Sequence, residues 1–113
     1  MCLGATTWAP LIGGSPATSA TAVAVATAGT IATPAATVSR VSPAGAVTGV
    51  ILTPGTVGGQ VVTVINEAVA GNSVTFAVAA TSNVADGVTS VIPGLRASTF
   101  TWDATTALWY RSA

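Results

Sequence analysis

The chain has 113 residues, of which 50% are hydrophobic and only 5% are charged. Three arginines balance three acidic residues, so the formal net charge is zero, and the sequence contains no lysine or histidine. Nucleic-acid binding and polybasic membrane anchoring need clustered positive charge, so we expect neither partner. A soluble domain typically carries about 25% charged residues. We therefore expect copies of the chain, or a larger assembly, to cover much of its surface.

Residues that carry catalysis or hold metals are scarce. A hydrolytic nucleophile needs a base such as histidine or lysine nearby, and neither residue type is present. The carboxylates Glu67, Asp86 and Asp103 each stand beside a turn signal, which favours a structural role over acid–base work. Cys2 is the only cysteine, so zinc lacks its usual ligands and no disulfide forms within the chain. The sequence predicts a protein that is not an enzyme, with no cofactor and no metal.

The most apolar stretch spans residues 17–38, where several threonines and Pro34 interrupt it. It lacks the roughly 18 consecutive strongly apolar residues that a membrane helix needs. The first residues also lack the basic region and the continuous apolar core of a signal peptide. We therefore expect no membrane span, and synthesis and residence in a cytoplasm.

Residues 1–40 are expected to form an irregular N-terminal arm with short extended segments at 21–27 and 37–41, because threonine and valine recur there between breaks at glycine and proline. Trp8 in this arm either packs on its own domain or docks onto another protein. A change of composition near residue 40 predicts a compact β module over 41–113.

Strand and turn signals alternate after residue 42 at spacings of about ten residues, which is typical of an all-β fold. Segment 60–66 is apolar on both sides, so it is predicted to be a central or interface strand. Segment 73–79 alternates cleanly, with Val74, Phe76 and Val78 expected to point inward. We predict a small antiparallel β-sandwich or barrel of about eight strands without helices. Its strands after the arm are expected at 47–52, 60–66, 73–79, 88–92, 97–103 and 108–111.

The segment 98–111 holds four of the six aromatic residues and is predicted to be a β-hairpin with its turn at 103–106. Its large rings are expected to fill the core, a subunit interface, or both. An alternative is that Trp102, Trp109 and Tyr110 stack on sugars beside Asp103. The candidate interface residues are Trp8, Phe100, Trp102, Trp109, Tyr110, Arg40, Arg96 and Arg111.

Four motifs follow one another between residues 38 and 111. They are GQVVTVIN at 59–66, TSNVADG at 81–87, FTWD at 100–103 and LWY at 108–110. In this order they resemble a β-rich module of virion surface proteins of tailed bacteriophages, which occurs in head fibres, capsid decoration proteins and tail-fibre segments. The resemblance implies a symmetric, trimeric β assembly on a virus particle and brings no catalytic residues with it.

These observations lead to one expected function and two alternatives. We expect a capsid decoration protein, made in the host bacterial cytoplasm, whose homotrimers bind the major capsid protein on the outer surface of the head and stabilise the shell. The first alternative is a head-fibre or tail-fibre tip that holds host glycans through Trp102, Trp109 and Tyr110. The second is a secreted adhesin or S-layer fragment, against which the missing signal peptide counts.

Overall fold

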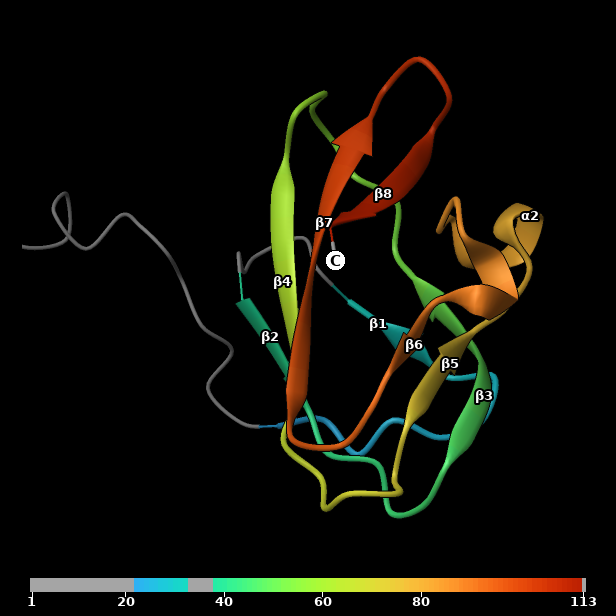
Figure 1. Cartoon of the computed structure of the whole chain (residues 1–113). Coiled ribbons are helices and arrows are strands. Elements are labelled where there is room, and N and C mark those ends of the chain that lie inside the picture. Colours follow the sequence, from blue (N-terminus) through green and yellow to red (C-terminus); the bar gives the residue numbers. More distant parts are fainter. Residues whose placement is uncertain (1–21, 33–37, 113) are drawn as a thin grey trace, which may run out of the picture.

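The computed structural model describes residues 22–32 and 38–112, which form one mostly-β domain with two sheets and little helix (Figure 1). One sheet has the strand order β1-β3-β5-β6, and the other has the order β2-β4-β7-β8. The first sheet consists of β1 (Thr30–Ile31), β3 (Val47–Leu52), β5 (Val74–Phe76) and β6 (Val91–Ile92). The second consists of β2 (Val38–Val41), β4 (Val61–Asn66), β7 (Arg96–Asp103) and β8 (Leu108–Ser112). Two short helical turns, α2 (Ala79–Ser82) and η1 (Gly87–Thr89), lie between β5 and β6.

Both sheets turn one face toward a single hydrophobic core. The rings of Phe76 on β5 and Phe100 on β7 meet edge to face, with centroids 5.6 Å apart, and so join the two sheets. Phe100 and Trp102 share the buried face of β7. Because most other core residues are valines, these rings supply much of the apolar surface whose burial stabilises the domain.

The directions of the strands differ from the prediction of an antiparallel fold, which is wrong for three of the pairings. β1 with β3, β2 with β4, and β3 with β5 pair in parallel. From β1 to β5 the chain alternates between the two sheets, so neighbours within a sheet are every second strand and run the same way. Only β4–β7, β5–β6 and β7–β8 are antiparallel among the named strands.

The central position predicted for segment 60–66 is confirmed. β4 lies between β2 and β7 in the second sheet. Val62 and Val64 point into the core and are fully buried, whereas Val61 is 43% exposed on the opposite face. The apolar residues on both sides of this strand therefore divide between the core and the outside of the sheet.

Two predicted strands are shorter in the structure because helical turns replace part of each. β5 ends at Phe76, and Val78, which was expected to point inward, is 55% exposed. Residue 78 instead accepts the first hydrogen bonds of α2, from the amides of Thr81 and Ser82. The strand expected at 88–92 starts only at Val91, because residues 87–89 form the 3-10 turn η1.

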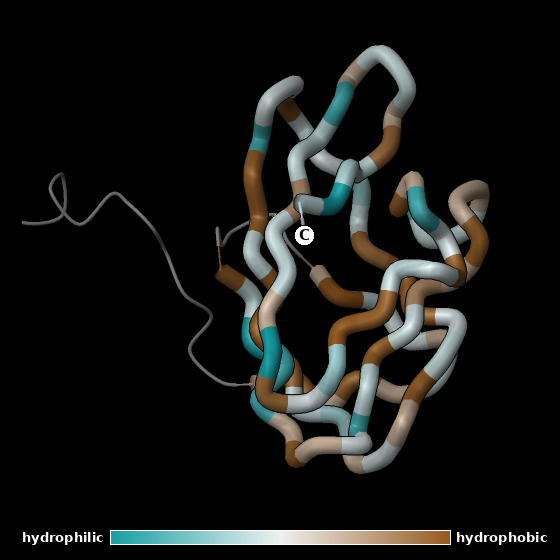
Figure 2. The backbone as a smooth tube through the Cα atoms, in the orientation of Figure 1, coloured by the Kyte–Doolittle hydropathy of each residue, from teal (hydrophilic) through white to brown (hydrophobic). Residues whose placement is uncertain are grey.

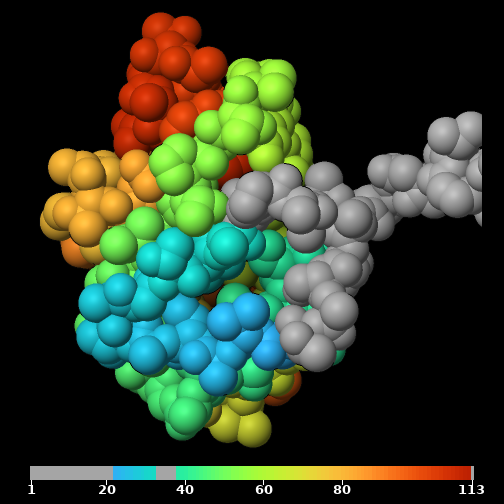
Figure 3. Space-filling model, turned by 180° about the vertical axis from the view of Figure 1, so that it is seen from behind, coloured from blue at the N-terminus to red at the C-terminus, as the bar shows by residue number. Residues whose placement is uncertain are grey.

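The described part of the expected arm packs into the domain. Val25 and Ile31 are buried in the core, and β2 crosses the expected boundary between residues 40 and 41. The strand predicted at 21–27 is replaced by an isolated bridge from Val23 to Val41, and the chain turns before β1. Seen from behind, residues 22–32 lie as blue and cyan atoms against the green atoms of β3 (Figure 3).

Candidate interaction surface

The tryptophans of the β7–β8 hairpin hold the fold together. Trp102 and Trp109 are cross-strand partners, with ring centroids 5.2 Å apart and a tilt of 60°. The indole N–H of Trp109 donates to the carbonyl oxygen of Thr53 at 2.8 Å, which links the hairpin to the segment after β3. Gly55 lies so close to the face of Trp102 that a Cβ atom there would be 2.3 Å from its ring. These contacts anchor the hairpin to the segment that follows β3 in the other sheet.

Three of the four hairpin aromatics are therefore core residues. Phe100 and Trp109 have no exposed surface, and Trp102 is 7% exposed. Of the two locations that the sequence left open, the core and a subunit interface, these three rings occupy the core of the chain. In this conformation they offer no face to a sugar or a second chain. Tyr110 alone of the four is well exposed, at 43%, and its hydroxyl group bonds Thr106 Oγ1 at 3.2 Å. Trp8 lies outside the described residues.

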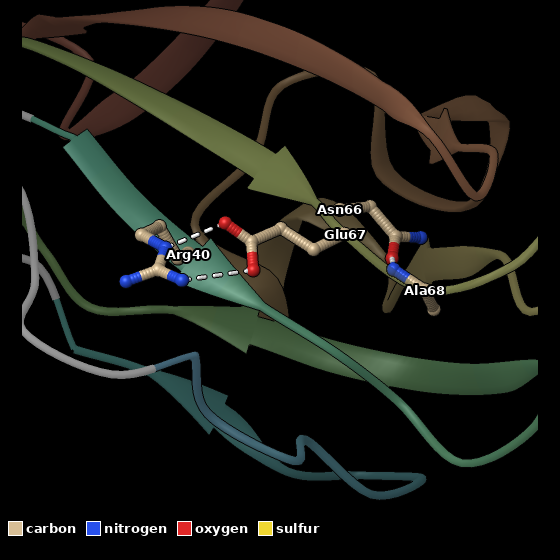
Figure 4. A network of polar contacts seen from close by, with 4 residues as sticks. All are labelled: Arg40, Asn66, Glu67 and Ala68. Carbon is tan, nitrogen blue, oxygen red and sulfur yellow. Dashed lines mark hydrogen bonds and ion pairs between the residues drawn. The ribbon is translucent and has the colours of Figure 1, made fainter.

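The three arginines fall in separate places. Arg40 forms two hydrogen bonds with the carboxylate of Glu67, from Nε at 2.5 Å and from Nη2 at 3.0 Å (Figure 4). This pairing lowers the pKa of Glu67 and raises the pKa of Arg40, chiefly through the hydrogen bonds and with a smaller contribution from the opposite charges. Arg111 donates to Ser90 Oγ at 3.2 Å, and Arg96 is exposed at the start of β7. The structure does not gather the arginines into one site.

The side-chain amide of the buried Asn66 makes three hydrogen bonds within the fold. Its Nδ2 donates to the carbonyl oxygens of Asn72 at 2.9 Å and Ile92 at 3.0 Å. Its Oδ1 accepts from the amide of Ala68 at 3.0 Å (Figure 4). These bonds tie the end of β4 to the following loop and to β6 in the other sheet. Residue 66 is thus a structural clamp between the sheets.

Of the three carboxylates that the sequence placed beside turns, Asp86 and Asp103 lie at turns, whereas Glu67 directly follows β4 and pairs with Arg40. Asp103 Oδ1 accepts from the amide of Thr105 at 2.8 Å and shapes the tip of the hairpin. Asp86 directly precedes η1, and its carbonyl oxygen accepts the hydroxyl of Thr89. In residues 22–32 and 38–112, no three histidine, cysteine, aspartate or glutamate side chains gather in a way that could hold a metal ion. No helix in these ranges is long and apolar enough to cross a membrane.

One candidate surface is the side of the β2-β4-β7-β8 sheet that faces away from the core, here called the outer face. Cross-strand pairs place Val61 beside Thr101, Thr63 beside Thr99, and Ile65 beside Ala97. Tyr110 and Leu108 of β8, with Val38 of β2, extend the same face. Figure 2 shows that the hydrophilic residues of this part of the fold lie mainly near strand ends and turns.

Charge is confined to the two ends of the outer face. All six charged residues of the chain lie in the described ranges, and between Arg40 at one end and Asp103 at the other the outer face carries none. Both end residues already bond partners within the chain. The middle of the face therefore presents aliphatic side chains, the methyl and hydroxyl groups of threonines, and one phenol ring.

The chain matches no protein-family model, no curated protein and no solved structure. Sequence reasoning singled out the two outward residues Arg40 and Tyr110 but missed Ala97, Thr99 and Thr101, whose small side chains carry no strong signal. The scarcity of charge and the apolar residues on both sides of β4 were the sequence features that indicated a contact surface.

Proposed function

We propose that the chain is a non-enzymatic structural protein of a tailed-bacteriophage virion, and specifically a capsid decoration protein. In this proposal its two sheets form a sandwich, its copies associate as a symmetric homotrimer, and the homotrimer binds the major capsid protein on the outside of the head. A protein that binds only the assembled shell stabilises that shell by mass action.

The observation that carries the proposal is the outer face, which has no charged residue between Arg40 and Asp103. A sheet side with no charge across its middle is unusual on a protein that works alone in water, because surfaces usually intersperse both signs. A surface of this kind favours contact with other protein chains. The motif resemblance over 38–111 supports a virion as the setting for that contact.

The placement of the polar side chains also supports a structural role. Asn66 and the Arg40–Glu67 pair each hold one part of the fold to another, and Asp103 bonds the amide of Thr105 within its own turn. Bonded in this way, these side chains are committed to the fold and not poised toward a substrate. The hairpin tryptophans are likewise core residues, which leaves Tyr110 as the one exposed hairpin ring. This weakens the alternative of a glycan-binding tip, which would need several exposed rings.

Heads of the encoding phage, prepared without this chain, provide the test. The purified chain is titrated onto these heads, bound copies are counted by quantitative gel analysis, and the temperature at which the heads release DNA is recorded. We expect saturable binding at a fixed number of copies per capsomer and a higher release temperature.

Heads without any bound copies after titration would contradict the proposal, and so would binding that leaves the release temperature unchanged. The matched control is the same titration with heat-unfolded chain, which should neither bind at a fixed number of copies nor protect the heads.

A further inference from the structure

We infer that copies of this chain meet head to tail, through two different surfaces that carry opposite charges. One surface, here called the basic end, consists of Val69, Leu95 and Arg96. The other, here called the acidic lobe, consists of Val78, Asp86 and Val88. The inference rests on the homotrimer of the proposed function and names the contact that holds it.

The two charges that the fold does not use are of opposite sign. Four of the six charged residues bond within the chain, namely Arg40, Glu67, Asp103 and Arg111. Within residues 22–32 and 38–112, the guanidinium of Arg96 and the carboxylate of Asp86 make no hydrogen bond or ion pair, and both residues are exposed. Each copy therefore presents one cation and one anion that a second copy complements.

The basic end is held rigidly by a turn that carries backbone strain. Leu95 has a φ of 66°, a left-handed conformation that is unfavourable for a bulky side chain. Its amide donates to the carbonyl oxygen of Asn66 at 2.9 Å, and the preceding Gly94 packs against the carbonyl oxygen of Val69. The side chains of Leu95 and Val69 remain 69% and 66% exposed, and Arg96 follows directly. The fold thus tolerates strain while it presents a leucine to solvent next to an unpaired cation.

The acidic lobe is formed by the two helical turns between β5 and β6. Gly87 of η1 lies against the start of α2, since a Cβ atom there would be 3.4 Å from Cα of Val78 and 3.1 Å from the amide nitrogen of Ala79. This packing brings Val78 close to Asp86 and Val88, which flank residue 87 in the chain. The two valines are 55% and 56% exposed. The lobe therefore matches the basic end in having two exposed aliphatic side chains and one charge, and differs from it in the sign of that charge.

The two surfaces lie on different parts of the molecule. They are at opposite ends of β6, because η1 precedes this strand and the turn with Leu95 follows it. In Figure 1, α2 lies at the right of the domain, whereas the loop that enters β7 lies at its lower end. A contact between two different surfaces leaves one of each kind free on a pair of copies, so further copies add until a ring closes. A ring of three uses every surface in three identical contacts.

The charges and the aliphatic side chains make different contributions to this contact. An exposed ion pair adds little affinity, but opposite charges orient the two surfaces, and like charges oppose a contact between two basic ends or two acidic lobes. Affinity comes from removing four aliphatic side chains from water, each of which is more than half exposed in the single chain. Each copy in a ring is also held by two contacts, which makes the assembly tighter than one contact alone.

The first test exchanges the two charges. Arg96→Glu leaves two carboxylates facing each other across the contact, and Asp86→Arg leaves two guanidinium groups there. We expect each single variant to associate only at concentrations about tenfold higher or more, and the double variant Arg96→Glu with Asp86→Arg to regain wild-type association. Molar mass is measured by light scattering over a concentration series, and folding is checked by circular dichroism.

Val57→Glu and Val57→Arg are the matched controls for these charge changes. Val57 is 66% exposed in the loop between β3 and β4, where the next residue lies against Ala104 of the hairpin tip. Both controls introduce the same side chains at a position outside the two surfaces. We expect both to associate as the wild type does.

The second test detects the contact itself. Cys2→Ser removes the only native cysteine, and in this background one chain carries Leu95→Cys and another carries Val88→Cys. A head-to-tail contact places residue 95 of one copy near residue 88 of the next, and neither residue near its own counterpart. After air oxidation of the mixture, we expect mass spectrometry and nonreducing gels to show disulfides between unlike chains in large excess over those between like chains.

The outcomes separate this inference from the proposed function. If the wild type associates while the single variants keep its mass, while the double variant fails to regain it, or while disulfides form mainly between like chains, the contact lies elsewhere and self-association stands. A mass that grows without limit would support the head-to-tail contact and contradict the homotrimer. If the wild type has the mass of one chain at every concentration, both this inference and the homotrimer fail.

Discussion

Single polar side chains act as clamps in this fold, and Asn66 is the clearest case. We expect Asn66→Ala to lower the free energy of unfolding by about 3 kcal/mol, because three hydrogen bonds worth about 1 kcal/mol each are lost. Chemical denaturation of the purified variant measures this change. Asn72→Ala, which removes one donated bond to Pro43, should cost about a third as much. An equal loss of unfolding free energy in the two variants would show that Asn66 does not contribute more than Asn72 to holding the sheets together.

Ser39 differs from Asn66 in that its buried polar group makes no hydrogen bond within the described residues. Its side chain lies 4% exposed on β2, and within the described part of the chain its hydroxyl oxygen is buried without a hydrogen-bond partner. Because an unpaired buried hydroxyl costs free energy, Ser39→Ala should raise the free energy of unfolding by about 1 kcal/mol. Thermal unfolding by calorimetry would detect this gain, and a lowered midpoint would mean that the hydroxyl has a partner in solution.

The Arg40–Glu67 pair predicts a specific pH dependence. The folded pKa of Glu67 is lowered by the hydrogen bonds from Arg40, so its stabilisation is fully present above the ordinary glutamate value of about 4.3. That contribution is lost as the pH falls from there through the lowered folded pKa. Glu67→Gln should remove this part of the acid-induced loss of stability, as measured by denaturation at a series of pH values.

Arg40→Gln gives the control for this prediction. Without the guanidinium, the pKa of Glu67 returns toward its ordinary value, and adding Glu67→Gln should then change the pH dependence no further. A double variant that still differs from Arg40→Gln in this acid range would assign the effect to another partner of Glu67.

Among the elements, the turn between β6 and β7 packs most tightly against its surroundings. A Cβ atom at Gly94 would be 2.0 Å from the carbonyl oxygen of Val69, which is backbone and cannot rotate away. Gly94→Ala should therefore lower the free energy of unfolding by about 2–3 kcal/mol. Gly45→Ala is the matched control, because nothing lies within 4 Å of its added Cβ and the effect should stay within about 0.5 kcal/mol. Similar denaturation midpoints for the two variants would contradict the packing described here.

Strand periodicity predicted some elements well and others poorly, for identifiable reasons. β3 matches its predicted range of 47–52, because Pro54 and Gly55 follow the apolar run and mark its end. The end of 73–79 was wrong because the local pattern does not show that Asn83, with its positive φ, caps α2 and donates to the carbonyl oxygen of Leu52. Parallel pairing was missed because alternation shows that a segment is a strand but not which sheet it joins.

The sequence predicted part of the candidate surface, as it predicted part of the strand pattern. The two apolar sides of β4 indicated a contact surface before the sheet order was known. The large aromatics drew attention first, yet Phe100 and Trp109 are needed inside the domain because few other bulky residues are available for the core. Which of several aromatic residues stays outside depends on pairing register, and sequence pattern alone does not provide it.

At the scale of the whole molecule, scarcity of charge is the property that links fold and function. The chain carries its six charged residues at or near strand ends and turns, and the middle of the outer face, between Arg40 and Asp103, holds none. Such a molecule gains by covering that side with another chain, since apolar surface is removed from water at little electrostatic cost. Association of copies is therefore the central claim of this account.

Sedimentation equilibrium of the wild-type chain at increasing concentration tests this claim most directly. The single chain has a mass of 10.9 kDa. We predict that the measured mass rises with concentration to a fixed multiple of this value, three in the proposed homotrimer. A mass of one chain across the whole concentration range, for a protein that is folded by circular dichroism, would contradict the account.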